Sequence, residues 1–120
     1  MRACVIIPAR YKSSRFPGKP LVKLLGKEMI IWVAELSSKA VGKNNVFVAT
    51  DNLEIESKVI ESGFKSIMTS SDLLTGTDRV AAASLDLDYD IYVNVQGDEP
   101  LLDPNDILRS IKLKKEFPSS

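Results

Sequence analysis

Four short apolar runs alternate with segments of helical periodicity, and this order constrains the fold more than any other feature of the chain. The runs are bounded by charged, proline or turn residues, as buried strands usually are, and they span residues 3–7, 46–49, 66–69 and 91–95. Strands that alternate with helices form parallel sheets through right-handed crossovers. The sequence therefore predicts an α/β fold with a mainly parallel sheet.

Helix signals follow each of these runs. Apolar residues recur at helical spacing between Ile30 and Val41, and a third helix is expected around residues 79–85. Polar caps and glycines predict where the helices begin and end. These boundary residues are Gly42 after the first helix, Asp51 or Asn52 before the second and Gly63 after it, and Asp103 with Pro104 before the last.

The composition narrows the class of protein. With 120 residues, 44% of them hydrophobic and 27% charged, the chain is expected to form one soluble globular domain over residues 1–120. Lys+Arg and Asp+Glu balance at 16 each, so a broad basic face for nucleic acid is not expected. No apolar run approaches the length of a membrane span, and the N-terminus lacks a signal-peptide pattern. We expect neither a nucleic-acid nor a membrane partner.

The cysteine and histidine counts limit the chemistry. Cys4 is the only cysteine and lies in the first apolar run, so we expect it to be a buried small hydrophobe. A single cysteine cannot form an intrachain disulfide, which fits a reducing cytoplasm. Histidine is absent, and this excludes histidine-dependent triads, histidine general bases and most zinc sites.

A cluster of amide, glycine and carboxylate residues follows the fourth run, at residues 94–100. In open α/β sheets, ligands bind just beyond the carboxyl ends of the strands. Gln96 can donate or accept hydrogen bonds there, and Asp98 and Glu99 are oxygen donors of the kind Mg²⁺ prefers. The alternative is a polar turn in which Pro100 only ends the strand.

A cationic segment, residues 8–20, follows the first run. It contains three prolines and no acidic residue, and its four cationic residues are Arg10, Lys12, Arg15 and Lys19. Arginine offers phosphate a planar fork of donors and lysine offers a mobile point charge. A solvated basic loop is the alternative for this segment alone. Together, the cationic and acidic segments suggest a metal–polyphosphate site.

A third polar segment, residues 75–79, begins the third helix. Backbone N–H groups at a helix N-terminus attract anions, and Arg79 could contact a base or sugar. A capped helix with a surface arginine is an equally good interpretation. The common phosphate fingerprints are absent, because the six glycines contain no G-x-G pair and no Gly-Lys pair completes a Walker A loop.

The polar segments, in this order, closely resemble the cytidylyltransferase family that activates 3-deoxy-manno-octulosonate (Kdo) as CMP-Kdo. The matching residues are 6–21, 48–51, 76–79 and 94–100, and the resemblance covers essentially the whole chain. Acylneuraminate cytidylyltransferases share the start Pro8-Ala9-Arg10, but they are not expected to show residues 16–21 together with residues 94–100. The resemblance implies a Rossmann-like, three-layer nucleotide-diphospho-sugar transferase fold.

The resemblance also implies an activity and roles for named residues. CMP would pass from CTP to the anomeric hydroxyl of Kdo for lipopolysaccharide synthesis, with release of pyrophosphate and with Mg²⁺ as cofactor, in a cytoplasmic enzyme that is a homodimer at full length. The implied roles are triphosphate binding and catalysis for Arg10 and Lys19 with Arg15 in support, cytidine contacts for Thr75, Gly76 and Arg79, orientation of nucleotide or sugar for Gln96, and Mg²⁺ ligation for Asp98.

Members of this family continue well beyond a position equivalent to residue 120. We therefore expect the chain to be a truncated, nucleotide-binding part of the domain that supplies the CTP and Mg²⁺ site and is inactive in isolation. The sugar pocket and a second metal ligand are expected in the remainder. Two alternatives stay open: a non-catalytic nucleotide-binding module, and a cytidylyltransferase for another 2-keto acid sugar, such as an amino analogue of Kdo or a sialic acid.

Overall fold

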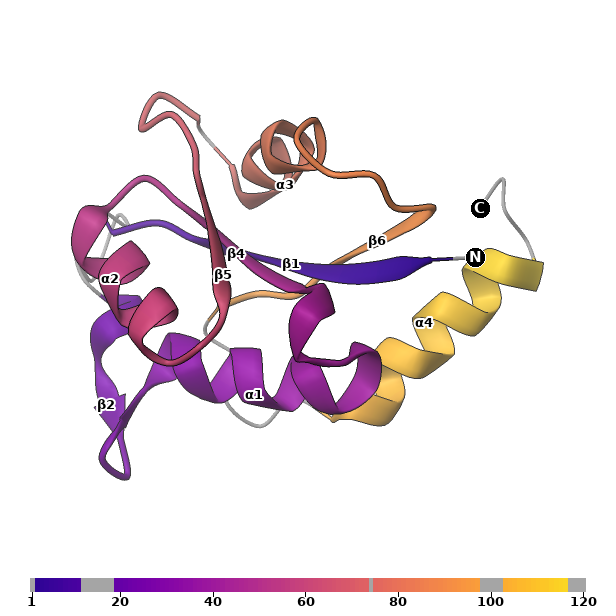
Figure 1. Cartoon of the computed structure of the whole chain (residues 1–120), viewed down its shortest axis with the longest axis horizontal. Helices are drawn as coiled ribbons and strands as arrows, with labels where there is room; N and C mark the ends of the chain where they lie inside the picture. Colours follow the sequence, from indigo (N-terminus) through magenta and orange to yellow (C-terminus); the bar gives the residue numbers. More distant parts are fainter. Residues whose placement is uncertain (1, 12–18, 74, 98–102, 117–120) are drawn as a thin grey trace.

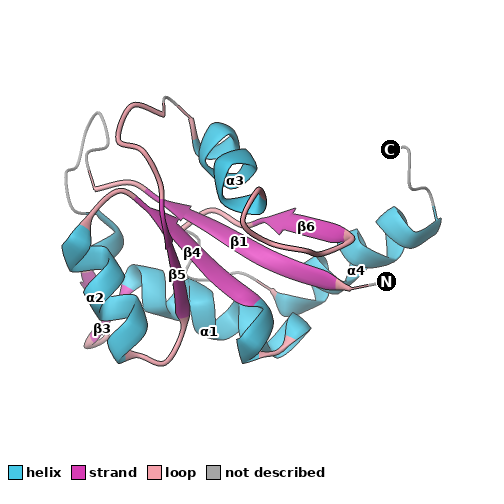
Figure 2. Ribbon diagram, turned by 45° about the horizontal axis from the view of Figure 1, so that its top comes forward, coloured by secondary structure: helices cyan, strands magenta, loops and turns pink. Residues whose placement is uncertain are grey.

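A parallel sheet of four strands forms the centre of the protein (Figures 1 and 2). The computed structural model describes residues 2–11, 19–73, 75–97 and 103–116. The strands are β1 (Ala3–Ala9), β4 (Val46–Thr50), β5 (Lys65–Met68) and β6 (Ile91–Asn94), and their order in the sheet is β5-β4-β1-β6. The predicted α/β fold with a parallel sheet is confirmed, and each strand lies within two residues of its expected position.

Strand β1 continues past its predicted end at Ile7 to Ala9, because Pro8 and Ala9 pair with Ala49 and Thr50 of β4. A proline is tolerated here for a geometric reason. The carbonyl of Ile6 accepts from Val95 N–H on the β6 side, and by alternation the nitrogen of Pro8 also faces that side. The β1–β6 ladder ends at Ile6, so the missing N–H of Pro8 costs no ladder hydrogen bond.

Helices cover both faces of the sheet and make three layers. Helices α1 (Met29–Val41), α2 (Leu53–Glu61) and α4 (Pro104–Glu116) lie on one face, and α3 (Gly76–Ser84) lies on the other (Figure 1). Alternate residues of β1 point into the two halves of the core: Val5 and Ile7 pack with α1, α2 and α4, whereas Cys4 and Ile6 pack towards α3. The expected three-layer arrangement is confirmed.

Local hydrogen bonds explain where the helices begin. Asn52, the second of the two proposed caps, accepts from the N–H groups of Glu54 and Ile55 at 2.9 and 3.0 Å, so Asp51 does not cap α2. Asp103 accepts from Asn105 N–H at 2.9 Å, as predicted. The third helix begins at Gly76, within the segment 75–79 that was predicted to start it and three residues before the expected range 79–85.

A short hairpin between η1 (Lys19–Leu21) and α1 was not predicted. Strands β2 (Lys23–Leu24) and β3 (Lys27–Glu28) pair antiparallel, and a second short helix, η2 (Lys43–Asn45), follows α1. Two-residue strands are too short to carry an apolar alternation, so the pattern gave no signal.

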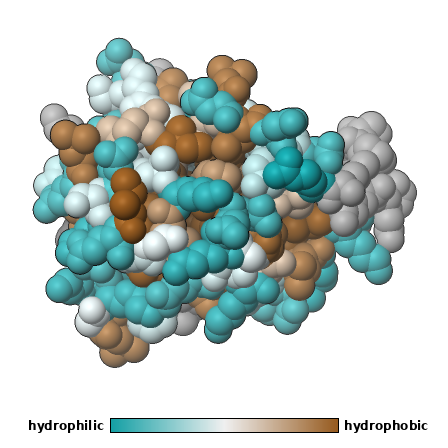
Figure 3. Space-filling view, in the orientation of Figure 1, coloured by the Kyte–Doolittle hydropathy of each residue, from teal (hydrophilic) through white to brown (hydrophobic). Residues whose placement is uncertain are grey.

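Two lysine side chains lie over aromatic rings near β5. Lys65 Nζ lies 5.5 Å from the centre of the Phe47 ring, and Lys43 Nζ lies 4.9 Å from that of Phe64. Hydrophilic residues are accordingly spread among hydrophobic ones on the face shown in Figure 3. Charged groups on an edge strand also discourage pairing with another chain.

Cys4 is fully buried in β1, as expected, and burial raises the pKa of its thiol to about 12. The thiol should therefore remain protonated and out of contact with solvent between pH 7 and 9. We expect native protein to react with a chromogenic disulfide reagent at least about 100-fold more slowly than protein in denaturant. Complete reaction of the native protein within minutes at pH 8 would contradict this burial.

No helix within the described part of the chain is long and apolar enough to cross a membrane.

Candidate functional site

The strand order creates a topological switch point between β1 and β6. From β1 the chain moves outwards to β4 and β5, and it then returns to place β6 on the opposite side of β1. Ligands of doubly wound α/β proteins bind at such a point, beyond the carboxyl ends of the strands. The cationic segment follows β1 and the amide and carboxylate segment follows β6, so both begin at this edge of the sheet.

Close packing around Pro8 brings three polar segments together. Gly97 is buried, and a Cβ atom there would lie 3.2 Å from both the Pro8 carbonyl oxygen and Ile30 Cδ1. A Cβ atom at Gly76 would lie 3.3 Å from Pro8 Cγ and 3.8 Å from Gln96 Oε1. The absence of side chains at these glycines lets the segments after β1 and β6 meet the start of α3.

Four of the predicted site residues are described at this edge of the sheet. Arg10 and Gln96 are exposed where β1 and β6 end, and Gln96 Nε2 lies 3.5 Å from Asn94 Oδ1. Thr75 is the N-cap of α3, where its hydroxyl accepts from Asp78 N–H at 3.0 Å, and Gly76 is the first residue of the helix. The hydroxyl hydrogen of Thr75 can still be donated to a ligand.

Arg79 is buried, so its interpretation as a surface arginine is wrong. Its side chain is 2% exposed and lies between α3 and the ends of β4 and β5. The guanidinium donates to Thr69 Oγ1, and to the Ser70 carbonyl at 3.2 Å. Burial lowers the pKa of Arg79, the Asp51 carboxylate beside it raises that pKa, and the nearby positive charge of Arg10 lowers it further.

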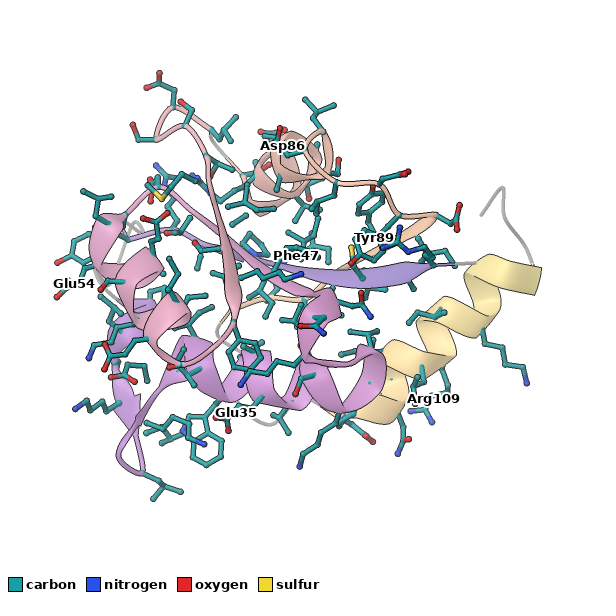
Figure 4. The ribbon with its side chains drawn as sticks, in the orientation of Figure 1. Glu35, Phe47, Glu54, Asp86, Tyr89 and Arg109 are labelled. Atoms are coloured by element: carbon teal, nitrogen blue, oxygen red, sulfur yellow. The ribbon has the colours of Figure 1, made fainter. Side chains whose placement is uncertain are left out.

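Asp51 is a site residue whose role the sequence analysis missed. Its Oδ2 atom lies 3.7 Å from Nη2 of Arg79, and its Oδ1 atom accepts from Tyr11 N–H at 3.4 Å. In Figure 4, oxygen and nitrogen atoms of several side chains lie at this end of the sheet, near α2, where Glu54 is labelled. The signal was present, because Asp51 follows β4 directly, but its position beside Asn52 suggested a helix cap.

The other predicted residues lie outside what the structure describes. Arg15 and Asp98 fall outside the described residues, and of Lys19 only the backbone, at the start of η1, is described. Among residues 2–11, 19–73, 75–97 and 103–116, no three His, Cys, Asp or Glu side chains are grouped to hold a metal ion. The predicted Mg²⁺ ligand, Asp98, therefore stays a prediction.

Gly97 offers a test of the packing at this edge of the sheet. Gly97→Ala should lower the free energy of unfolding by roughly 1–3 kcal/mol, because the added methyl group must displace the backbone of Pro8 or the Ile30 side chain. Urea unfolding of both proteins measures the change.

A suitable control is Gly26→Ala in the β2–β3 turn, where the added methyl group meets no atom within 4 Å but φ is +82°. That change should cost about 1 kcal/mol through backbone strain. Equal stability of the Gly97→Ala protein and the parent would contradict the packing at Pro8.

The three-layer fold, with its switch point between β1 and β6, defines a protein of the doubly wound α/β class. Residues 4–119 match the cytidylyltransferase family, and the chain belongs to that family. The resemblance found in the sequence is confirmed.

The relatives of the chain include enzymes of Kdo-type sugars. It is 48% identical to an 8-amino-3,8-dideoxy-manno-octulosonate cytidylyltransferase from Shewanella sp. (strain ANA-3), over 98% of this chain and 49% of that protein. It is 42% identical to a CMP:2-keto-3-deoxy-manno-octonic acid synthetase whose structure contains CTP, with a TM-score of 0.94 over 99% of this chain and 49% of that one.

A more distant structure shows the fold alone. A cytidylyltransferase from Leptospira borgpetersenii serovar Hardjo-bovis (strain JB197) is 24% identical, with a TM-score of 0.84 over 99% of this chain and 51% of that one. The chain thus spans about half the length of the curated relatives it matches.

Proposed function

We propose that the protein transfers CMP from CTP to Kdo, with release of pyrophosphate, and that these 120 residues supply its CTP-binding part. The observation that carries the proposal is the 42% identity to a CTP-bound CMP-Kdo synthetase over 99% of this chain. The arrangement at the end of β1 supports it, because Arg10, the Gln96 amide and the start of α3 all lie at that edge of the sheet. The whole protein is proposed to act as a homodimer in the cytoplasm.

Charge and position suggest how the phosphates are held. In the proposed reaction, the anomeric oxygen of the sugar forms a bond to the α-phosphorus, the bond between the α-phosphorus and the bridging oxygen breaks so that pyrophosphate leaves, and the hydroxyl proton passes to solvent. Negative charge grows on the α-phosphoryl and leaving oxygens. Arg10 and Lys19, with Arg15 in support, would hold the triphosphate and stabilise that charge.

The oxygen-bearing residues at and after the end of β6 support a proposed magnesium site. Asn94 and Gln96 carry exposed amide oxygens, and Asp98 follows two residues later. Oxygen ligands together with substrate phosphates are the usual surroundings of protein-bound Mg²⁺. Asp98 would hold the ion, which when bound would neutralise phosphate charge; Gln96 would orient nucleotide or sugar.

The start of α3 is proposed as the nucleoside end of the site. Thr75 can donate its hydroxyl hydrogen, and Gly76 allows a ligand to approach the backbone N–H groups of the first turn. Arg79 lies in the same helix and is buried, and its guanidinium is proposed to contribute to the cytidine contacts. Together these groups would select cytidine.

The names of several relatives favour a second candidate for the acceptor sugar. Relatives that are 47–48% identical are named as cytidylyltransferases of 8-amino-3,8-dideoxy-manno-octulosonate. That sugar and Kdo differ at C8, so groups that contact C8 would distinguish them. Acceptor preference is measured by supplying each sugar in turn to the whole protein and detecting the CMP-sugar formed. A sialic acid is the remaining acceptor to include.

Titration calorimetry of the purified chain with CTP and UTP, each with Mg²⁺, tests the proposed function. Binding of CTP with at least about tenfold preference over UTP is expected, because the two bases present different donors and acceptors. Equal binding of both nucleotides would point to a general polyphosphate site. Absence of binding would favour a module without nucleotide function.

Asp98→Asn should weaken Mg²⁺-dependent CTP binding and leave the fold intact. Loss of one anionic ligand removes a charge-assisted contact worth ~1.5–3 kcal/mol, or about a tenfold or greater loss of affinity. Titration with and without Mg²⁺ separates this effect from phosphate binding, and Asp86→Asn on an exposed turn is the control. Unchanged metal dependence in Asp98→Asn would remove the metal-ligand assignment.

A further inference from the structure

One carboxylate connects three segments at the carboxyl edge of the sheet. Asp51 follows β4, receives the N–H of Tyr11 from the segment after β1, and lies against Arg79 of α3. The Asp51 side chain is 10% exposed and that of Arg79 is 2% exposed, so water screens this pair little. The guanidinium of Arg79 is in turn fixed by Thr69 and Ser70 at the end of β5.

The N–H that Tyr11 donates to Asp51 belongs to the peptide group that joins Arg10 and Tyr11. Ala9, paired with Thr50, is the last residue of β1 in the sheet, so Arg10 is the first residue beyond the ladder. Anchoring the peptide that follows Arg10 restricts the backbone on both sides of that residue. The direction in which the Arg10 side chain leaves the sheet is thereby restricted as well.

The charges around Arg79 also relate Asp51 to Arg10. Arg10 and Arg79 are close enough for the charge of Arg10 to lower the pKa of Arg79, and Asp51 is the carboxylate beside that buried arginine. Nη2 of Arg79 has no hydrogen-bond acceptor among the described residues. Arg10 and Arg79 thus bring two cationic groups to this edge of the sheet, and cationic groups attract an anionic ligand.

We propose that Asp51, held by Arg79, is a positioning residue that aims Arg10 at the triphosphate of the bound nucleotide. This inference rests on the proposed function, since it assigns a task to the CTP site. Asp51 would touch no substrate atom and would act through the Arg10–Tyr11 peptide. A helix-capping role does not explain the residue, because Asn52 caps α2.

A double-mutant cycle on the purified chain tests this inference. The four proteins are the parent, Asp51→Ala, Arg10→Ala and the double variant, each titrated with CTP and with inorganic tripolyphosphate. Asp51→Ala should weaken binding of either ligand about tenfold in the parent and less than about twofold when Arg10 is already alanine. Asp86→Ala, which removes an exposed carboxylate, should leave both affinities unchanged.

A second variant covers the case in which Asp51→Ala does not fold. Asp51→Ala with Arg79→Met removes both buried charges and keeps most of the side-chain volume. It should still lose about tenfold in tripolyphosphate affinity, and this ligand lacks the nucleoside that Arg79 is proposed to recognise. An affinity equal to that of the parent would overturn the positioning role.

The outcomes separate the inference from the proposed function. Equal losses from Asp51→Ala with and without Arg10 would overturn the inference while CTP binding to the parent stood. Tripolyphosphate binding with the expected coupling, but without preference for CTP, would support the inference and count against the proposed function. Failure of the parent to bind tripolyphosphate would overturn the inference.

Discussion

Asp51→Ala should lower the free energy of unfolding by roughly 3–5 kcal/mol, because it leaves the buried guanidinium of Arg79 without a compensating charge. The hydrogen bonds of Arg79 to Thr69 and Ser70 satisfy donors but do not neutralise the ion. A loss of this size is a large share of the stability of a domain of 120 residues.

A second substitution should reverse most of this loss. Adding Arg79→Met removes the uncompensated charge, and apolar replacements of buried ion pairs are often neutral or stabilising. We expect the double variant to recover to within about 1–2 kcal/mol of the parent, although each single substitution is strongly destabilising. Urea denaturation followed by far-UV circular dichroism measures all four proteins.

The control is Asp86→Ala, which should change stability by less than about 0.5 kcal/mol, because its side chain is exposed after α3 (Figure 4). Additive losses in the double variant would show that the two side chains are not energetically coupled. A loss below about 1 kcal/mol for Asp51→Ala would show that Arg79 is well hydrated without its partner.

The strands and most helix ends were predictable because their causes are local. An apolar run such as residues 46–49 is buried on both faces, and its composition shows this without knowledge of its neighbours. The caps Asn52 and Asp103 bond to N–H groups two or three residues away, so sequence spacing identifies them. Such signals do not depend on the remainder of the fold.

The features that could not be predicted depend on contacts between residues that are far apart in the sequence. β1 ends at Ala9 rather than Ile7 because β4 offers Ala49 and Thr50 for pairing, and the sequence does not show that register. Arg79 looked like a surface residue because its partners, Asp51 and Thr69, lie 28 and 10 positions earlier. Sequence alone therefore indicated the segments of the site but not the contact that joins them.

The largest effect is expected in the rate of CMP-Kdo synthesis, when the 120-residue polypeptide is compared with a full-length relative. Even where it binds CTP, its rate of CMP-Kdo synthesis should be at least about five orders of magnitude below that of a full-length relative. Transfer requires the sugar hydroxyl to be held in line with the α-phosphate, and such positioning contributes on the order of 7–11 kcal/mol. The matched relatives are about twice as long as this chain.

Pyrophosphate release with CTP, Mg²⁺ and Kdo measures this rate, with the 8-amino-sugar cytidylyltransferase from Shewanella sp. (strain ANA-3) and its own acceptor as the positive control. Calorimetric binding of CTP to the same preparation must accompany the assay, so that inactivity is not mistaken for misfolding. Turnover within about tenfold of the control would place the acceptor site within these 120 residues. The cationic segment after β1 would then have to bind the carboxylate of the sugar as well as phosphate, because Arg10, Arg15 and Lys19 are the groups proposed to meet anions there.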